Sequence, residues 1–131
     1  MSNLCSEVLQ VQTPSVINDA QEFVKMGTDI SCNLGSTNVV NMMTSPDFGR
    51  SIKAMTRALT FVSDTSSIEA VPTIKHGNEQ AHTFGLGAMG LHTFLAQHHI
   101  HYGSPESIEF TNIYFMLMNY WYFGGIKSYR S

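Results

Sequence analysis

The sequence predicts a mixed α/β structure that is mainly helical, with one or two short strands. Residues 1–40 are rich in β-branched and turn residues, which favour extended and irregular backbone. Two triplets, Ser45-Pro46-Asp47 and Ser104-Pro105-Glu106, have the cap, proline and acid pattern that starts a helix. The chain has 131 residues and 43% hydrophobic content, so we expect one domain or part of one.

The strands are predicted near the start of the chain. Residues 7–11 alternate polar and apolar side chains, as a short strand does, and residues 29–40 form a second extended segment interrupted by Gly35. Pro14 and Gly27 mark a loop region between the two segments.

Three helices are predicted after the strands, at about residues 46–63, 78–97 and 104–122. Apolar residues spaced by three and four positions place one stripe on each helix. The stripes are Ile52, Met55, Leu59 and Val62; Phe84, Ala88, Leu91 and Leu95; and Ile108, Phe115, Met118 and Tyr122. The last helix also carries apolar residues on its other faces, so we expect neighbours around it.

Three glycines, at positions 85, 87 and 90, lie inside the predicted helix 78–97. Each costs about 1 kcal/mol of helix propensity relative to alanine. They indicate either the close approach of another backbone or a helix that is broken at this point.

Composition and charge exclude several classes of protein. The formal charge of −3 and the lack of a basic run argue against a nucleic-acid partner. Neither a targeting sequence nor a run of about 18 apolar residues is present, so we expect a cytoplasmic chain without a membrane partner. The two cysteines, Cys5 and Cys32, are too few and too far apart for a secreted disulfide scaffold.

The strongest local chemical pattern is Asn3, Cys5 and Glu7. In extended backbone, residues two apart project from the same face, so these three side chains would converge on one ligand. They offer an amide, a thiol and a carboxylate that acts as a base. The alternative is a polar chain terminus in which the spacing is accidental. For each cysteine taken alone, the alternative is a small buried hydrophobic residue.

Histidines 98, 99 and 101 could suggest a metal site, but the cluster lies at a predicted helix end without organised acidic or thiol ligands. A helix C-terminal turn that favours positive charge explains it better, so we expect no metal. The glycine-containing turns lack the full pattern of a phosphate-binding loop.

A run of ordered motifs resembles one family across about residues 1–121. The motifs are MSNLCSEVLQVQTPS, GTDISCNLGSTNVV, SPDFGRSIKAMTRALT, VPTIKHGN, HTFGLGAMGLH and YGSPESIEFTNIYFM. Together they resemble the large, catalytic subunit of class Ib ribonucleoside-diphosphate reductases. The resemblance implies part of a ten-stranded α/β barrel with a finger loop, here residues 1–10, that carries a radical cysteine.

The resemblance also implies the roles of the residues in that loop. Cys5 becomes a thiyl radical that abstracts the 3′ hydrogen of the ribose, Glu7 deprotonates the 3′ hydroxyl, and Asn3 orients the substrate. The loop residues Asn3, Leu4, Cys5, Ser6 and Glu7 bind the substrate. Cys32, in the segment 28–40, is one half of a redox-active pair whose partner thiol lies in another segment.

The same resemblance implies the partners and cofactors. The substrate is a ribonucleoside diphosphate, the small subunit generates the radical, and a glutaredoxin- or thioredoxin-like protein supplies electrons. Other large-subunit segments or a second copy complete the assembly. No cofactor is expected in this chain, because the metal-radical cofactor belongs to the small subunit, and nucleotide effectors act on parts outside it.

Residues 122–131 cease to resemble the family, and a shifted reading frame after Trp121 is one hypothesis for this tail. Other features of a working large subunit, such as its allosteric region, are expected to lie outside these 131 residues. We therefore expect an internal fragment that is inactive alone. The alternative is a non-catalytic remnant or a docking segment of a split reductase.

Overall fold

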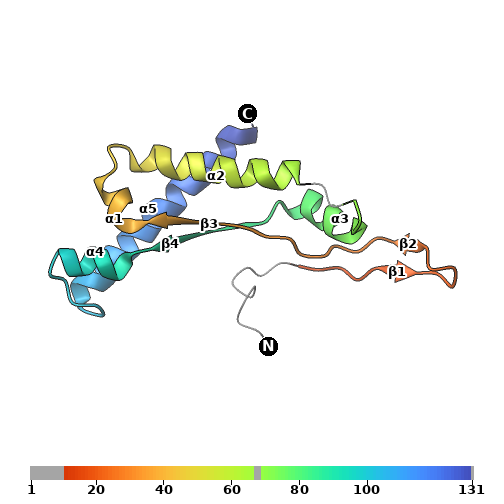
Figure 1. Cartoon of the computed structure of the whole chain (residues 1–131), viewed down its shortest axis with the longest axis horizontal. Helices are drawn as coiled ribbons and strands as arrows, with labels where there is room; N and C mark the ends of the chain where they lie inside the picture. Colours follow the sequence, from red (N-terminus) through yellow and green to blue (C-terminus); the bar gives the residue numbers. More distant parts are fainter. Residues whose placement is uncertain (1–10, 67–68, 131) are drawn as a thin grey trace. The chain divides into compact units, whose positions relative to one another are not determined.

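The computed structural model describes the backbone of residues 11–66 and 69–130, with side chains up to residue 127. Helices predominate over short strands in this part of the chain, as the sequence predicted (Figure 1). In chain order the elements are β1 (Val16–Ile17), β2 (Phe23–Lys25), β3 (Asn33–Asn38), α1 (Val39–Thr44), α2 (Phe48–Thr65), α3 (Pro72–Ala81), β4 (Phe84–Met89), α4 (Leu91–Gln97) and α5 (Pro105–Arg130).

The chain divides into two compact units. The first contains the residues up to Leu34 and Leu59–Gly85, and the second contains Gly35–Ala58 and the residues from Leu86 onward. Across residues 11–66 and 69–130 the named strands form two-stranded sheets, β1–β2 and β3–β4, and no closed barrel. The architecture fits the prediction of a barrel fragment that is mainly helical.

An antiparallel hairpin occupies the region that the sequence analysis assigned to a loop. Strands β1 and β2 pair with Val16 opposite Lys25, and an irregularity follows Val16. The Asn18 side chain closes the turn by accepting hydrogen bonds from the backbone N–H groups of Ala20 and Glu22 at 3.1 and 2.8 Å. The prediction of a loop between Pro14 and Gly27 was wrong, because the short strands β1 and β2 pair with each other and Asn18 forms the turn that joins them.

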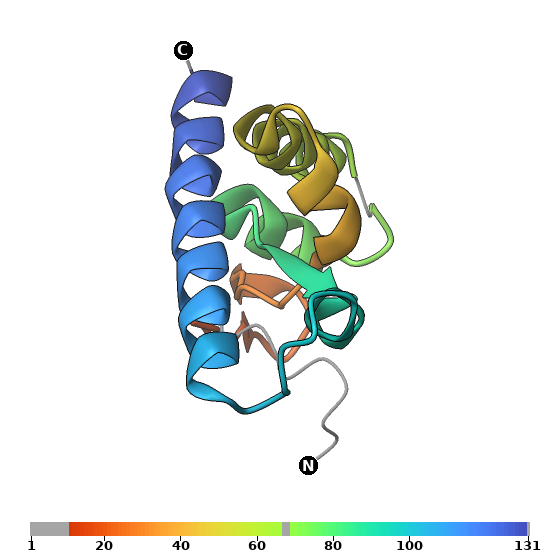
Figure 2. The same ribbon diagram turned by 90° about the vertical axis from the view of Figure 1, so that its left-hand side faces the viewer.

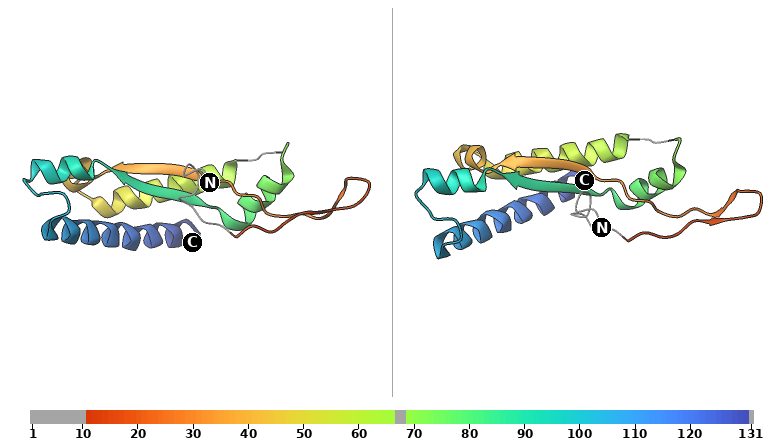
Figure 3. Two further views of the ribbon diagram at one scale, coloured as in Figure 1. Left: turned by 90° about the horizontal axis from the view of Figure 1, so that it is seen from below. Right: turned by 60° about the horizontal axis from the view of Figure 1, so that its bottom comes forward.

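Strands β3 and β4 run in the same direction (Figure 3). The Asn33 N–H donates to the Thr83 carbonyl oxygen at 3.4 Å, and the Thr37 hydroxyl donates to the Gly87 carbonyl oxygen at 3.2 Å. Both contacts join residues fifty positions apart, so the two strands are parallel. The predicted extended segment 29–40 is confirmed at β3. Its last residues instead start α1, which Asn38 caps.

Helix α2 confirms the predicted helix 46–63, although it begins two residues later. Its cap is the Asp47 carboxylate, which accepts from the Arg50 N–H at 2.8 Å, and not the predicted Ser45. The predicted apolar stripe was only half right, because Val62 is 44% exposed while Thr56 is fully buried. The Thr56 hydroxyl is satisfied inside the helix, where it donates to the Ile52 carbonyl oxygen.

The predicted helix 78–97 was right at its two ends, which lie in α3 and α4, and wrong in its middle, which forms β4. The chain forms the end of α3, then β4, then α4. Of the two explanations for the glycines, the break is observed: β4 exchanges helical hydrogen bonds for pairing with β3, and Gly90 takes a left-handed φ of 78° before α4. Residues 84–89 form a strand because they pair with β3, which lies about fifty residues earlier in the chain. Local periodicity does not reveal a partner at that distance.

The core of the second unit comes from α1, α2, α4 and α5. Phe94 stacks on Phe110 with ring centroids 4.5 Å apart, and Tyr114 contacts Phe48 edge to face at 5.4 Å. The buried apolar side chains of this cluster are Val39, Met42, Ile52, Phe94, Leu95, Tyr114 and Met118.

Helix α5 confirms the predicted helix 104–122 and continues without a break to Arg130 (Figure 2). Ser104 caps it as predicted, since its hydroxyl oxygen accepts from the Ser107 N–H at 3.2 Å. The predicted face was only half right, because Met118 is buried as expected while Ile108 is 55% exposed and Tyr114 is buried instead. Neighbours do not surround this helix within the described residues, where Met116 and Phe123 are also exposed.

Glu106, in the first turn of α5, gives a pH-dependent test of this cap. Hydrogen bonds to its own backbone N–H and to Ser104 hold the pKa of Glu106 below its usual value. Its contribution to stability is therefore present above the usual glutamate pKa of about 4.3 and is lost as the pH falls through the lower folded-state pKa. We expect Glu106→Gln to lower the melting temperature slightly at neutral pH and not at about pH 3, as thermal unfolding by circular dichroism would measure. An equal difference at both pH values would contradict the assignment.

Candidate active site

Cys32 is the predicted site residue that lies within the described part of the chain. It directly precedes β3 in the first unit, is partly buried, and forms no disulfide among the described residues. Its Sγ lies 3.8 Å from the Asn33 carbonyl oxygen, a long and weak sulfur hydrogen bond. This contact places the thiol beside the first residue of β3.

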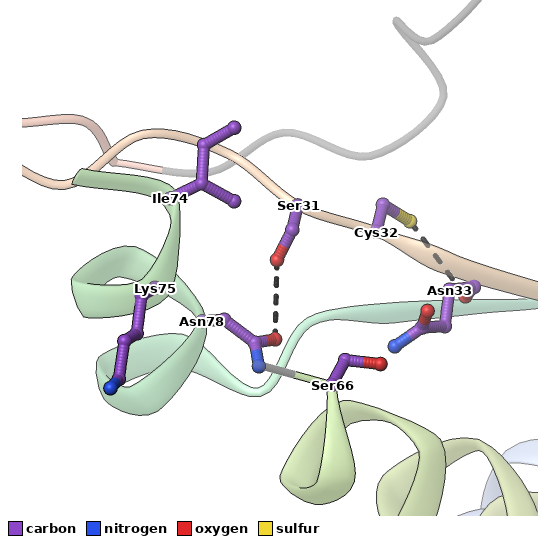
Figure 4. A pocket seen from close by; sticks show the side chains of 7 residues that line it. All are labelled: Ser31, Cys32, Asn33, Ser66, Ile74, Lys75 and Asn78. Carbon is purple, nitrogen blue, oxygen red and sulfur yellow. Dashed lines mark hydrogen bonds between the residues drawn. The ribbon is translucent and has the colours of Figure 1, made fainter. Parts of the chain in front are cut away.

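A cavity of about 120 Å³ lies beside this thiol (Figure 4). Such a volume holds several water molecules, whereas nucleotide-sized ligands need roughly 300 Å³ or more. The cavity alone is too small for a nucleotide. Its lining residues are Ser31, Cys32, Asn33, Ser66, Ile74, Lys75 and Asn78.

Asn78, on α3, is the most connected polar side chain of the cavity. It is 8% exposed, and its Oδ1 accepts hydrogen bonds from the hydroxyls of Ser31 at 3.1 Å and Ser63 at 2.7 Å. Its Nδ2 donates to the Ser63 carbonyl oxygen at 2.6 Å. These bonds satisfy a buried amide and join the segment before Cys32 to the last turns of α2.

Two further contacts hold the same segment to α3. The Asp29 N–H donates to the Thr73 carbonyl oxygen at 3.1 Å, and the Thr73 hydroxyl donates to the Asp29 carboxylate. Gly77 allows this close approach, because a Cβ atom built on it would collide with the Asp29 carbonyl oxygen. Residues 29–31 are thus anchored on α3 immediately before Cys32.

Charged side chains lie near the same end of the first unit. The Lys75 ammonium contacts the Glu69 carboxylate at 2.8 Å, and this hydrogen bond, together with the negative charge of Glu69, raises the pKa of Lys75. His82 Nδ1 lies 2.8 Å from the Asp64 carboxylate, which is an ion pair when the imidazole is protonated. Neither of these pairs involves Cys32, although Lys75 also lines the cavity beside the thiol.

A family model described as "Ribonucleotide reductase, barrel domain" matches residues 1–124. The chain belongs to this family. It is 50% identical over 121 residues to the ribonucleoside-diphosphate reductase subunit alpha of Mycoplasma pneumoniae, and 45% identical over 120 residues to that of Bacillus subtilis. Each of these matches covers 92% of this chain and 17% of the relative, so the chain spans about a sixth of the length of these proteins.

A more distant relative gives a shorter match. The ribonucleoside-diphosphate reductase subunit alpha of Helicobacter pylori is 36% identical over 92 residues, which is 69% of this chain. The resemblance read from the motifs to the large subunit of a ribonucleotide reductase is therefore confirmed. The matched barrel domain extends three residues past Trp121, where the resemblance was expected to end.

The predicted loop residues of this barrel domain, Asn3, Leu4, Cys5, Ser6 and Glu7, lie outside the described residues. Their roles and their distance from Cys32 stay predictions. Motif reasoning found Cys32 but missed Asn78, which lines the same cavity, and Ser63, which contacts Asn78. The signal for Asn78 is weak in the sequence, since its partners lie 47 and 15 residues away along the chain.

The histidine cluster lies in the second unit, at the end of α4. His98 is the C-cap residue and packs on Phe94 with ring centroids 4.3 Å apart, while His99 has a φ of 57°. Within residues 11–66 and 69–130, no three histidine, cysteine or acidic side chains group as a metal site requires. In the same part of the chain, no helix has the length and apolarity to cross a membrane.

Proposed function

We propose that this chain contributes the radical loop and one redox cysteine to the reduction of ribonucleoside diphosphates. The observation that carries the proposal is the match of residues 1–124 to the reductase barrel domain, which includes both cysteines. The position of Cys32 beside a small cavity, after a segment anchored on α3, supports it. The chain is proposed to act in the cytoplasm as part of a larger catalytic subunit.

In the proposed reaction, the Cys5 thiyl radical takes the 3′ hydrogen of the ribose while Glu7 accepts the proton of the 3′ hydroxyl. The 2′ hydroxyl then leaves as water. Cys32 and a second thiol from another segment supply two electrons and two protons and become a disulfide. Return of the hydrogen atom from Cys5 to C3′ and of the proton from Glu7 to the 3′ oxygen regenerates the radical and the carboxylate. The net change is one ribonucleotide and two thiols converted to a deoxyribonucleotide, a disulfide and water.

Asn3 and the backbone of residues 3–7 are proposed to bind and orient the ribose in this reaction. Excluding water from the loop is essential, because a thiyl radical reacts with other hydrogen donors. The small subunit is proposed to hold the metal-radical cofactor that forms this radical. A glutaredoxin- or thioredoxin-like protein restores the dithiol, and nucleotide effectors bind parts of the subunit outside this chain.

A graft tests the proposal. The 120 matched residues of the Bacillus subtilis subunit alpha are replaced by the corresponding residues of this chain, and deoxynucleotide formation is measured with its small subunit and a dithiol. We expect product from the graft and none from the same graft carrying Cys5→Ser. The 131-residue chain alone should give no product.

The result that favours the alternative, a non-catalytic remnant or docking segment, is equally specific. It is a folded graft that binds the small subunit and forms no more product than its Cys5→Ser version. The unmodified Bacillus subtilis subunit serves as the positive control for the assay.

A further inference from the structure

We propose that the exposed face of α5 binds α5 of a second copy of this chain, with the two helices antiparallel. The face is one stripe along the helix, here called the α5 seam. Its residues are Glu109, Ile113, Met116, Tyr120, Phe123 and Lys127. The proposed reduction of ribonucleotides does not require this contact, so the inference goes beyond the proposed function.

The spacing of the α5 seam is that of a helix pair. Its residues follow one another at intervals of four, three, four, three and four positions. A repeat of about 3.5 residues keeps side chains on one side of a helix and joins two helices in a coiled coil. The four middle residues are large and apolar, and each is between 46% and 68% exposed.

The seam lies on a different side of α5 from the core. Tyr114 and Met118 pack into the core of the second unit, with Phe110 partly buried beside them. At 3.6 residues per turn, the centre of this core stripe lies roughly 140° around the helix from the centre of the seam. A helix that is apolar on two sides is expected to have neighbours on both. A second helix can therefore bind the seam and leave the core unchanged.

The two ends of the seam carry opposite charges. Glu109 precedes the apolar residues and Lys127 follows them. Both side chains are exposed, and neither forms an ion pair within the described residues. Antiparallel pairing places Glu109 of each copy against Lys127 of the other, whereas parallel pairing places like charges together. The charges thus select the antiparallel arrangement.

The register that pairs these charges also matches the apolar residues. Glu109 and Lys127 are equally distant from Met118 along the chain, so a two-fold axis would pass beside Met118. The same axis brings Ile113 against Phe123 and Met116 against Tyr120, since each of these pairs is also centred on residue 118. A symmetric dimer requires a face that is self-complementary in this way.

The complete seam is a feature of this chain and not of the matched domain. The match to the reductase barrel domain covers residues 1–124, and Lys127 lies beyond it. Helix α5 continues through this position without a break. The basic end that selects the antiparallel arrangement therefore comes from the tail.

Sedimentation velocity of the reduced 131-residue chain tests the proposal. The seam is about 27 Å long, so it buries less than the roughly 1,200 Å² of a stable interface, and we expect a dissociation constant on the order of 10 μM. The chain should be monomeric at about 1 μM and mainly dimeric at about 100 μM.

Met116→Glu places a charge at the centre of the seam in both copies. We expect it to weaken the dimer at least about 100-fold, since a central apolar contact is lost and a carboxylate is desolvated. Ile108→Glu is the matched control, because Ile108 lies on the same helix, is 55% exposed against 62% for Met116, and lies off the seam. The control should change the dissociation constant by less than about twofold. Circular dichroism checks that both variants fold.

Charge reversal tests the antiparallel register. Glu109→Lys and Lys127→Glu should each weaken the dimer about tenfold, because symmetry turns two attractive pairs into repulsive ones. An equimolar mixture of the two variants should dimerise as the original chain does, since each pair then joins opposite charges again. The double variant that carries both changes should also recover.

Three results would overturn the inference. A chain that stays monomeric at about 100 μM would mean that something other than a second copy covers this face. A dimer unaffected by Met116→Glu would use another surface. A dimer that Met116→Glu disrupts, while neither charge reversal changes it, would have a different register. None of these results bears on the proposed function, which the graft tests through product formation.

Discussion

Replacing Gly77 by alanine is expected to lower the free energy of unfolding of the chain by about 3 kcal/mol, as urea denaturation would measure. The new Cβ atom would collide with the backbone carbonyl oxygen of Asp29, which cannot rotate away as a side chain can. The collision must outweigh the helix propensity gained by alanine, which is about 1 kcal/mol. The helix would separate from the segment that carries Cys32, so its thiol should also react faster.

Gly124→Ala is the control for this change, because Gly124 also lies within a helix. A Cβ atom there would meet only the end of the flexible Lys53 side chain, at 3.4 Å. We expect this variant to be neutral or to gain up to about 1 kcal/mol. Equal stability of the two alanine variants would show that Gly77 is not in the close contact described.

Replacing Cys32 by serine is expected to reduce deoxynucleotide formation in the graft by at least about 10³-fold, the order of effect when one member of a catalytic unit is removed. The proposed reaction draws two electrons from a pair of thiols, and one remaining thiol cannot form the intramolecular disulfide. Product is measured by chromatography with excess dithiol. Folding of the variant is checked by circular dichroism.

Ser66→Ala provides the matched comparison for Cys32→Ser, since both residues line the same cavity and both changes are small. It should retain most of the activity. If Cys32→Ser also retained most of the activity, Cys32 would be a buried structural cysteine, the alternative that composition alone left open.

Local signals in the sequence predicted the parts of the fold that local interactions determine. The Ser104-Pro105-Glu106 triplet marked the start of α5 because its hydrogen bonds are made within one turn. The middle of the predicted helix 78–97 was assigned wrongly because β4 is stabilised by β3, which lies about fifty residues earlier. Ser63 was not expected in a buried position, since its hydroxyl is satisfied by Asn78, a partner 15 residues away that periodicity does not show.

Some residues of the candidate site could be predicted from the sequence and others could not. Cys32 was found through a family motif, and the barrel family is confirmed. Asn78 was not found, because an asparagine within a helix is ordinary until its contacts with Ser31 and Ser63 are known. The predicted roles of Asn3, Cys5 and Glu7 depend on the same family motif, and they lie in the part of the chain that the structure does not describe.

The most direct test of the proposed radical role is tritium release from a ribonucleoside diphosphate labelled at C3′. The graft is incubated with substrate, small subunit and dithiol, and the tritium that appears in water is counted. We predict release of a fraction of the tritium from the graft and from its Cys32→Ser variant, because the Cys5 thiol that carries the abstracted tritium exchanges part of it with water before the return to C3′. None is expected from the Cys5→Ser variant. Release that persists in the Cys5→Ser variant would contradict the assignment of Cys5 as the residue that abstracts the hydrogen.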